Sequence, residues 1–221
     1  MCNLYRHEGA VEAIRQFAAA MGRAFRTSPA TGNLPPDYVG ADSDGPILTN
    51  TDGDLLLDNA RWGFPPAKQG AKPITNIRNL KSRWWRDVNR PYFLEAEYRC
   101  LVPFTRFAEW NAAEKANAWF QPVDQPAFFA GIWRPWTGER LVKVDGQKRR
   151  QRVTQDFTLY AFLTCEPNSI VAPIHEKAMP VVITSPEAAS EWMAGGDESF
   201  ALARPMPDDG LEIWDEGRAT A

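Results

Sequence analysis

The sequence has few cysteines and few histidines, and this scarcity excludes several classes of protein. The 221 residues include three cysteines, an odd number, and no two of them form a CxxC pair. Such thiols are typical of a reduced cytosolic protein and match neither a disulfide framework nor a zinc site. Only two histidines are available, so we expect no metal centre.

Long apolar runs, a basic net charge and the familiar cofactor motifs are also missing. The start of the chain lacks the apolar stretch of a signal peptide, and no segment is long enough to span a membrane, so we expect a cytoplasmic protein. A formal net charge of −3 gives no global basic field for nucleic acid, although it leaves room for a local basic groove. The absence of GxGxxG, Walker-type, HExxH and GxSxG sequences argues against nucleotide cofactors, zinc proteases and serine hydrolases. We therefore expect no cofactor.

Among the residues that are present, the second is the most informative. Cys2 follows Met1 directly, so removal of Met1 would leave an α-amine and a thiol on adjacent carbons. An α-amine has a pKa of about 7.7–8.0, against about 10.4 for lysine, and keeps far more free base at neutral pH. Such an amine condenses with an aldehyde, and the thiol can then close a thiazolidine ring on the imine. The alternative is that position 2 is cysteine by chance.

The pattern of apolar and turn-forming residues predicts a single α+β domain over residues 1–221. Apolar residues three and four positions apart predict a helix over 11–25, and Ser185-Pro186-Glu187 predicts a helix that ends near Gly195-Gly196. Thr51–Asp54 is a hairpin signal. Helices scattered among strands favour α+β over an alternating parallel sheet. We expect mostly short strands, over 100–104, 127–133, 153–164 and 179–184, and a loose tail over 212–221.

Three polar side chains are candidates for chemistry. His175 lies between two apolar segments and is suited to proton transfer, or it is a solvated loop imidazole. Glu109 is flanked by aromatic residues that can raise its pKa, which suits a general acid or base, but a surface glutamate paired with arginine would have the same pattern. Asn76 can hold a substrate oxygen through its amide, or merely cap a turn.

Basic residues alternate with indoles between Arg78 and Arg90. Phosphate contacts together with stacking surfaces are what single-stranded nucleic acid requires, but a helix with tryptophans on its buried face would give the same string. A second basic cluster, Lys143–Arg152, contains Asp145-Gly146 and predicts a solvated hairpin tip. The first run contains Lys81, Arg83, Trp84, Trp85 and Arg86.

In chain order, these features resemble the SOS response-associated peptidase (SRAP) family. The resemblance covers most of the chain and rests on the order and spacing of several segments. It implies a curved, barrel-like sheet of mostly antiparallel strands with flanking helices. The matching segments are Met1-Cys2, Asn33-Leu34-Pro35-Pro36, Arg61-Trp62-Gly63-Phe64, Thr75-Asn76-Ile77-Arg78, Arg99–Pro103, Phe107-Ala108-Glu109-Trp110, Gly131-Ile132-Trp133, Ile174-His175, Met179-Pro180-Val181-Val182 and Ser185-Pro186-Glu187.

The resemblance implies that the protein captures abasic sites in single-stranded DNA during the SOS response to DNA damage. Cys2, exposed by removal of Met1, would form a thiazolidine crosslink with the ring-opened deoxyribose. Asn76, Glu109 and His175 would hold the sugar and move protons. Autoproteolytic removal of Met1 and a β-elimination lyase activity are implied as well. The residues assigned to DNA binding, by the resemblance or by their place in the basic run, are Arg78, Arg61, Trp62, Asn33, Pro36, Arg83, Arg86 and Trp85.

The chain departs from the family pattern next to these residues. Asn3 and Leu4 replace the usual glycine and arginine, a glutamate is missing from Asn76–Lys81, and a tryptophan is missing from Phe64–Lys68. We therefore expect a divergent bacterial or phage member, acting as a monomer, that keeps the chemistry and has rebuilt part of its DNA surface. Two other functions stay open: a thiol peptidase that uses Cys2 and His175, and a non-covalent single-stranded DNA-binding module.

Overall fold

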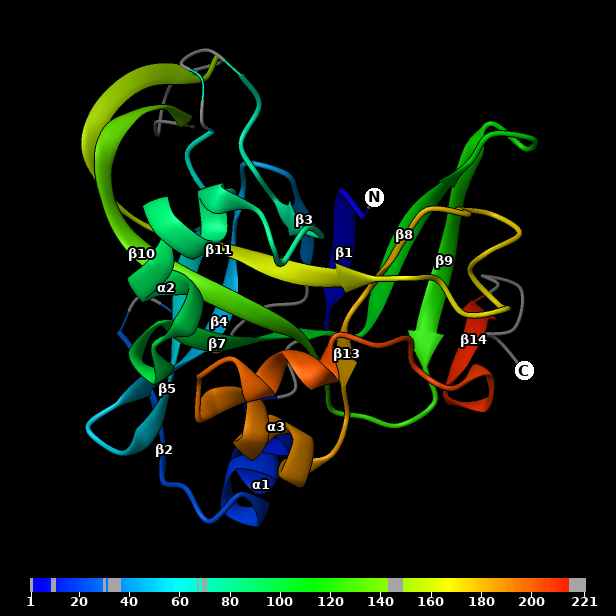
Figure 1. Ribbon diagram of the computed structural model, residues 1–221, viewed down its shortest axis with the longest axis horizontal. Coiled ribbons are helices and arrows are strands. Elements are labelled where there is room, and N and C mark those ends of the chain that lie inside the picture. Colours follow the sequence, from blue (N-terminus) through cyan, green and yellow to red (C-terminus); the bar gives the residue numbers. More distant parts are fainter. Residues whose placement is uncertain are drawn as a thin grey trace.

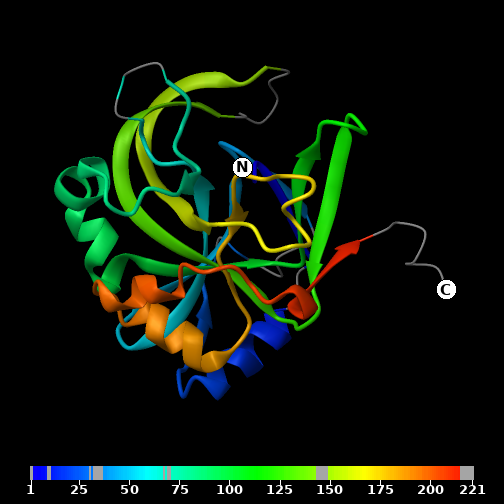
Figure 2. The ribbon, with the colours of Figure 1, turned by 45° about the vertical axis from the view of Figure 1, so that its right-hand side comes forward.

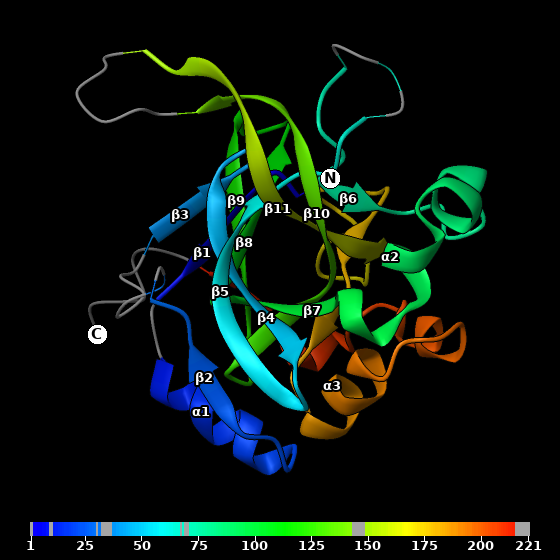
Figure 3. The same cartoon turned by 90° about the vertical axis from the view of Figure 1, so that its left-hand side faces the viewer.

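The computed structural model describes residues 2–8, 11–29, 31, 37–66, 68, 71–142 and 149–214, and five of its strands close into a ring. Neighbouring strands of the ring pair antiparallel, except that β5 and β11 pair in parallel and thereby close it. Figure 3 looks into this barrel. The α+β class and the barrel-like sheet are confirmed. The strands of the ring are β4 (Asp44–Thr51), β5 (Asp54–Trp62), β7 (Arg99–Phe104), β10 (Ala127–Val142) and β11 (Gln151–Cys165).

Aromatic side chains fill the barrel. Phe129 of β10 stacks on Phe104 of β7, with 3.7 Å between ring centroids, and on Phe162 of β11 at 4.4 Å. Trp62 of the neighbouring strand β5 stacks on Phe162 at 5.0 Å. All four side chains are buried, so this cluster supplies a large share of the apolar area that stabilises the fold.

β10 is much longer than predicted and β11 extends slightly beyond its predicted bounds, while most of the other strands are short, as expected. β10 and β11 span 16 and 15 residues and pair from Gly131↔Phe162 to Val142↔Gln151. Their outer halves are polar and form a curved arm that projects beyond the barrel (Figure 1). The sequence did not reveal the β10 side of this arm because a strand without a buried face has no apolar run. Of the predicted hairpin tip, residues 143–148 lie outside the described part of the chain.

A second sheet, of five strands, carries the start of the chain, and β1 is flanked on both sides by partner strands (Figure 2). Because β1 pairs with both β3 and β8, the residues just before it are held firmly. β14 falls within the predicted loose tail, so residues 212–214 are part of a strand, and residues 215–221 lie outside the described part. The order is β14 (Leu211–Trp214), β9 (Ala116–Pro122), β8 (Arg106–Asn111), β1 (Leu4–His7) and β3 (Asp37–Gly40).

The first helix is shorter than predicted, and the last begins as predicted. α1 (Val11–Ala20) stops before residue 25 because Gly22 adopts a φ of +70° and β2 (Phe25–Thr27) then joins β5. α3 (Pro186–Met193) starts at Ser185, whose Oγ accepts a hydrogen bond from the backbone nitrogen of Ala188 at 3.2 Å.

Short elements complete the molecule. The predicted strand 179–184 is divided into β12 (Met179–Pro180) and β13 (Val182–Ile183). Among the described residues, no helix is long and apolar enough to cross a membrane. The other elements are β6 (Asn76–Ile77), α2 (Arg90–Leu94) and the helical turns η1 (Trp84–Val88), η2 (Ala96–Tyr98), η3 (Glu198–Leu202) and η4 (Asp208–Gly210).

Candidate active site

Cys2 lies immediately before the second sheet, and its side chain is fully buried. Its thiol donates a hydrogen bond to the backbone carbonyl of Leu4, with 3.4 Å between Sγ and oxygen. Burial, and after it the negative charge of Glu109, raises the pKa of the Cys2 thiol well above its usual value. At neutral pH the sulfur is therefore a protonated thiol, which needs a base before it can act as a nucleophile.

Glu109 lies on β8 beside β1, in the stretch where Leu4 pairs with Ala108. The residue is 2% exposed, and its carboxylate accepts a hydrogen bond from the backbone nitrogen of Cys2. Burial raises the pKa of Glu109 to about 7, although the charge of the amino terminus and the hydrogen bonds lower it. A group that exchanges a proton near neutral pH thus contacts the nitrogen that becomes the α-amine when Met1 is removed.

Asn76 approaches Cys2 from the barrel side. It lies on β6, which pairs in parallel with the end of β11 at Phe162. Its Nδ2 donates hydrogen bonds to the carbonyl of Cys2 and to Oγ1 of Thr75, both at 2.8 Å. Its Oδ1 is buried and has no hydrogen-bond partner within the described residues. Asn76 therefore fixes the backbone of Cys2 and leaves an acceptor oxygen available beside it.

His175 lies in the turns that connect β11 to β12. Its Nδ1 lies 2.9 Å from the carbonyl oxygen and 3.3 Å from the backbone nitrogen of Ala178, which fixes the ring. Burial, and after it the charge of the amino terminus, lowers the pKa of His175, so the imidazole is neutral at neutral pH. The charge of the amino terminus lowers the pKa of both His175 and Glu109.

A comparison with known families identifies the family of this chain. The model of the SOS response associated peptidase (SRAP) family matches residues 1–216. The chain belongs to this family. Membership associates the protein with the SOS response and hence with DNA damage.

Two solved structures share the SRAP fold seen here. A protein from Bordetella bronchiseptica is 17% identical, with a TM-score of 0.69 over 97% of this chain and 100% of that chain. A protein from Bacteroides thetaiotaomicron is 19% identical, with a TM-score of 0.68 over 100% of this chain and 95% of that chain. A search of curated proteins gave no match. At these identities the likeness concerns the fold alone.

One of the arginines assigned to DNA, Arg78, lies directly beside the site of this SRAP domain. It follows Asn76 and Ile77 of β6, and its guanidinium forms an ion pair with Glu166 at 2.9 Å. Its side chain is 37% exposed, against 76% for Glu166, so solvent reaches both groups. A phosphate could therefore replace the carboxylate without rearrangement of the core.

The basic run is divided between surface and core. Arg83 is 94% exposed and forms an ion pair with Asp87, while Arg86 bonds to the Leu80 carbonyl and to Asp197. Trp85 is buried and packs against Phe64 and Phe93, so its indole is not a surface for stacking. Lys81 and Arg83 of this run are exposed and Arg86 is partly exposed, and the assignment of Arg83 and Arg86 to DNA stays a prediction.

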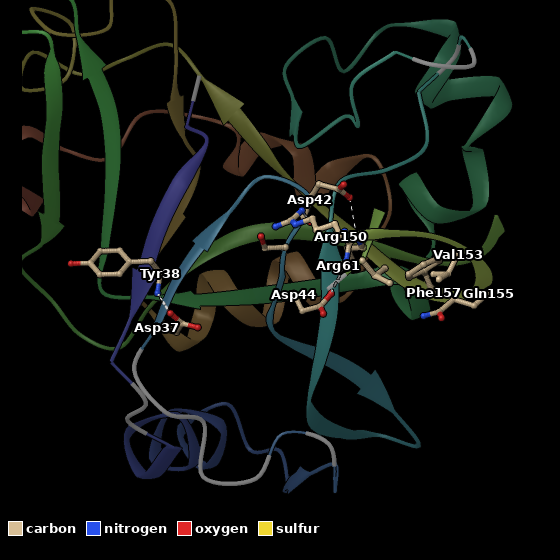
Figure 4. A pocket seen from close by; sticks show the side chains of 11 residues that line it. Asp37, Tyr38, Asp42, Asp44, Arg61, Arg150, Val153, Gln155 and Phe157 are labelled. Carbon is tan, nitrogen blue, oxygen red and sulfur yellow. Dashed lines mark hydrogen bonds and ion pairs between the residues drawn. The ribbon is translucent and has the colours of Figure 1, made fainter. Parts of the chain in front are cut away.

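Arg61 and Trp62 are buried. Arg61 donates to Asp42 at 2.9 Å and to the Leu141 carbonyl at 2.6 Å, and Figure 4 shows it beside Asp42 and Asp44 in a pocket of about 640 Å³. Trp62 donates from Nε1 to the Thr75 carbonyl at 3.0 Å, which helps to hold the strand of Asn76. The predicted residues Asn33 and Pro36 lie outside the described part of the chain.

The turn over 40–43, in which the backbone nitrogen of Ser43 donates to the Gly40 carbonyl at 3.1 Å, was not predicted from the sequence. Asp42 adopts a φ of 59° and accepts the hydrogen bond from Arg61, while Ala41 donates from its backbone nitrogen to the Asn3 carbonyl at 3.2 Å. The residue after Cys2 is thereby linked to the wall of the barrel by hydrogen bonds. The Asp-Ser-Asp-Gly sequence over 42–45 is a turn signal that could have located this link.

Within the described part of the chain, no group of three His, Cys, Asp or Glu side chains could hold a metal ion.

Proposed function

We propose that this SRAP domain, after loss of Met1, captures the aldehyde of an abasic site in single-stranded DNA as a thiazolidine on Cys2. The observation that carries the proposal is the hydrogen bond from the Cys2 nitrogen to the carboxylate of Glu109, whose pKa is raised to about 7. An amine that must attack, and later shed or gain a proton, requires such a partner. A buried thiol on the same residue supplies the second bond.

The first step joins the amine of Cys2 to the aldehyde carbon. The uncharged amine attacks, a carbinolamine forms, and its proton moves from nitrogen to oxygen. The protonated carboxyl of Glu109 then gives its proton to the departing hydroxyl, so that water leaves and an iminium remains. Since the pKa of Glu109 is raised to about 7, a large fraction of this group carries the proton at neutral pH.

The second step closes the ring and restores the catalyst. The thiol sulfur of Cys2 bonds to the iminium carbon, and its proton returns to the carboxylate of Glu109, which leaves the ring nitrogen neutral. The raised pKa of the thiol makes this base necessary, because little thiolate exists before the step. The product is one water lighter than the separate reactants, and no oxidant or metal takes part in this sequence.

Asn76 and His175 orient the reactants in this proposal. Asn76 bonds the Cys2 carbonyl, so its free oxygen lies where a sugar hydroxyl could donate to it. His175 is neutral and anchored through Nδ1, and a neutral imidazole beside the amine does not repel or compete with its positive charge. Arg78 supplies the nearest phosphate contact.

The thiol peptidase is the weaker alternative. A cysteine peptidase needs a lowered thiol pKa and an imidazole bonded to the sulfur. Here the Cys2 sulfur donates to the Leu4 carbonyl, and its pKa is raised. A narrower peptidase role, the removal of Met1 from the chain itself, is consistent with the same contact, because Glu109 can protonate the Cys2 nitrogen as the peptide bond breaks.

Crosslinking to abasic single-stranded DNA tests the proposal. We expect wild-type protein to give a species that survives denaturing electrophoresis, and Cys2→Ala to give none. Cys2→Ser keeps the amine but loses the thiol, so we expect an adduct only after reduction of the imine with cyanoborohydride. Intact mass, measured on the same preparations, should lack Met1. No wild-type product, or an undiminished product from Cys2→Ala, would contradict the proposal.

A further inference from the structure

A cleft of about 620 Å³ lies between Pro65, Pro66, Ala71 and Pro73 on one side and the exposed part of β10 on the other. Its walls combine three features: prolines on one side, an indole on the other, and two arginines at the edge. No part of the proposed chemistry uses this cleft. Its principal lining residues are Pro65, Pro66, Pro73, Trp136, Arg140 and Arg152.

The indole of Trp136 is held in a fixed position. It lies over Gly138, where an added Cβ would come within 2.1 Å of a ring atom, so only glycine leaves room for it. The guanidinium carbon of Arg140 lies 4.9 Å from the centre of the ring, and Phe157 of β11 stacks beside it at 6.0 Å. Trp136 is nevertheless partly exposed and lines the cleft. A rigid, partly exposed aromatic surface is what an unpaired base stacks on.

Positive charge accompanies this aromatic surface. The Arg140 side chain is 8% exposed, donates to the Gly63 carbonyl at 3.0 Å and lies 3.7 Å from Asp42. Its Nε is buried and has no hydrogen-bond partner among the described residues. Arg152 is 70% exposed and forms an ion pair with Glu139, so a phosphate can compete for it. A planar group with an attached anion fits this combination.

The cleft and the site around Cys2 are connected by a short stretch of chain. Phe64 and Ile74 exchange two backbone hydrogen bonds of 2.9 Å, which keep the adjacent Pro65 and Pro73 close together. Asn76 follows Pro73 by three residues, a span of about 10 Å in extended chain. A DNA strand whose sugar reaches Cys2 can therefore also reach the cleft.

We propose that this cleft binds one unpaired base, with its phosphate, of the DNA strand whose abasic sugar reacts with Cys2. The base stacks on Trp136 against the proline wall, and the phosphate lies toward Arg152. This inference rests on the proposed function, because it takes the same strand as ligand. It differs from the proposed function because it concerns the affinity for DNA and the position of the strand along the protein, and it requires no covalent step.

A double-mutant cycle between protein and DNA tests base binding in the cleft separately from the crosslinking reaction. Cys2→Ala protein is titrated with oligonucleotides that carry a tetrahydrofuran abasic analogue, which cannot open to an aldehyde, at the centre. In a series of further oligonucleotides, a second tetrahydrofuran analogue replaces one flanking nucleotide, at a different position in each. Stacking of about 1–3 kcal/mol per base corresponds to a loss of about 5-fold or more. We expect this loss at one flanking position, and no loss there once Trp136→Ala is added.

The controls make each outcome decisive. Trp136→Phe should keep most of the coupling, whereas Trp119→Ala, a partly exposed tryptophan on β9, should leave the pattern unchanged. If Trp136→Ala binds as tightly as its parent, or loses the same affinity at every position, the cleft is not a base site. If the Cys2→Ala protein shows the position-specific loss while wild-type protein forms no crosslink, the cleft is supported and the proposed function is contradicted. Denaturant midpoints of the variants show that a loss of binding is not a loss of fold.

Discussion

At the residue scale, the account depends on the chemical state of Cys2 and Glu109. The thiol of Cys2 is buried and protonated, and the carboxyl of Glu109 is poised near neutral pH at the nitrogen of the same residue. Each shift has burial as its first cause, so both depend on how β1 and β8 pack together. If position 2 were cysteine by chance, there would be no reason for a carboxyl group to be buried beside its backbone nitrogen.

The pH profile of crosslinking reports on Glu109 directly. The reaction needs a free amine, which is lost below a pH of about 8, and a protonated Glu109, which is lost above a pH of about 7. Wild-type protein should therefore show a bell-shaped profile with a maximum between these values. Glu109→Gln cannot titrate, so we expect a rate reduced by about 100-fold or more and no fall on the alkaline side. Single-turnover rates measured from pH 5 to pH 9 provide this comparison.

Glu166→Gln is the matched control for that profile, because it removes an acidic group from the edge of the same site. The variant should retain the alkaline fall, since the pKa of Glu109 depends on burial. If the crosslinking rate does not fall at alkaline pH in either variant, Glu109 is not the acid of the mechanism.

At the scale of elements, the ends of paired strands explain how the site is assembled. β6 and β11 run parallel and end together, so Arg78 and Glu166 meet just beyond them. Likewise β1 pairs with β8, which brings Glu109 to the nitrogen of Cys2. Pairing between segments that are distant in the chain leaves no local pattern in a sequence, so these contacts could not be predicted from spacing.

The ion pair between Arg78 and Glu166 gives a prediction at this scale. If Arg78 binds phosphate, Glu166→Gln should free it and lower the DNA concentration for half-maximal crosslinking by about 2- to 5-fold, because an exposed pair contributes about 0.2–1 kcal/mol. Glu191→Gln makes the same charge change on α3, at the far end of the molecule from β1 (Figure 1), and should have no effect. An equal gain from both variants would mean that net charge alone is responsible.

Elements with a buried face could be predicted, and elements without one could not. The apolar runs gave β7 and most of β11, and Ser185-Pro186-Glu187 located α3 because capping leaves a local signature. The outer half of β10 and the strand β14 were missed, because their residues are largely exposed. The buried Trp85 shows the opposite limit: the alternation of charge and indole in the sequence could not distinguish a core residue from a stacking surface.

At the scale of the whole molecule, a net charge of −3 means that DNA must be held by local contacts. The residues nominated for chemistry, Cys2, Asn76, Glu109 and His175, are far apart in the sequence. The structure links Cys2 directly to Asn76 and Glu109, and the charge of the amino terminus links it to His175. The types of residue could be predicted because the chemistry of an aldehyde requires them. Their contacts required the pairing of the two sheets with the barrel.

The mass of the purified protein–DNA product tests the central claim most directly. The account predicts the mass of the chain without Met1, plus the mass of the abasic oligonucleotide, minus one water, unchanged by cyanoborohydride because a thiazolidine has no imine to reduce. Fragmentation should locate the added mass on Cys2. A product that retains Met1, gains hydrogen on reduction, or carries the DNA on a lysine would contradict the account.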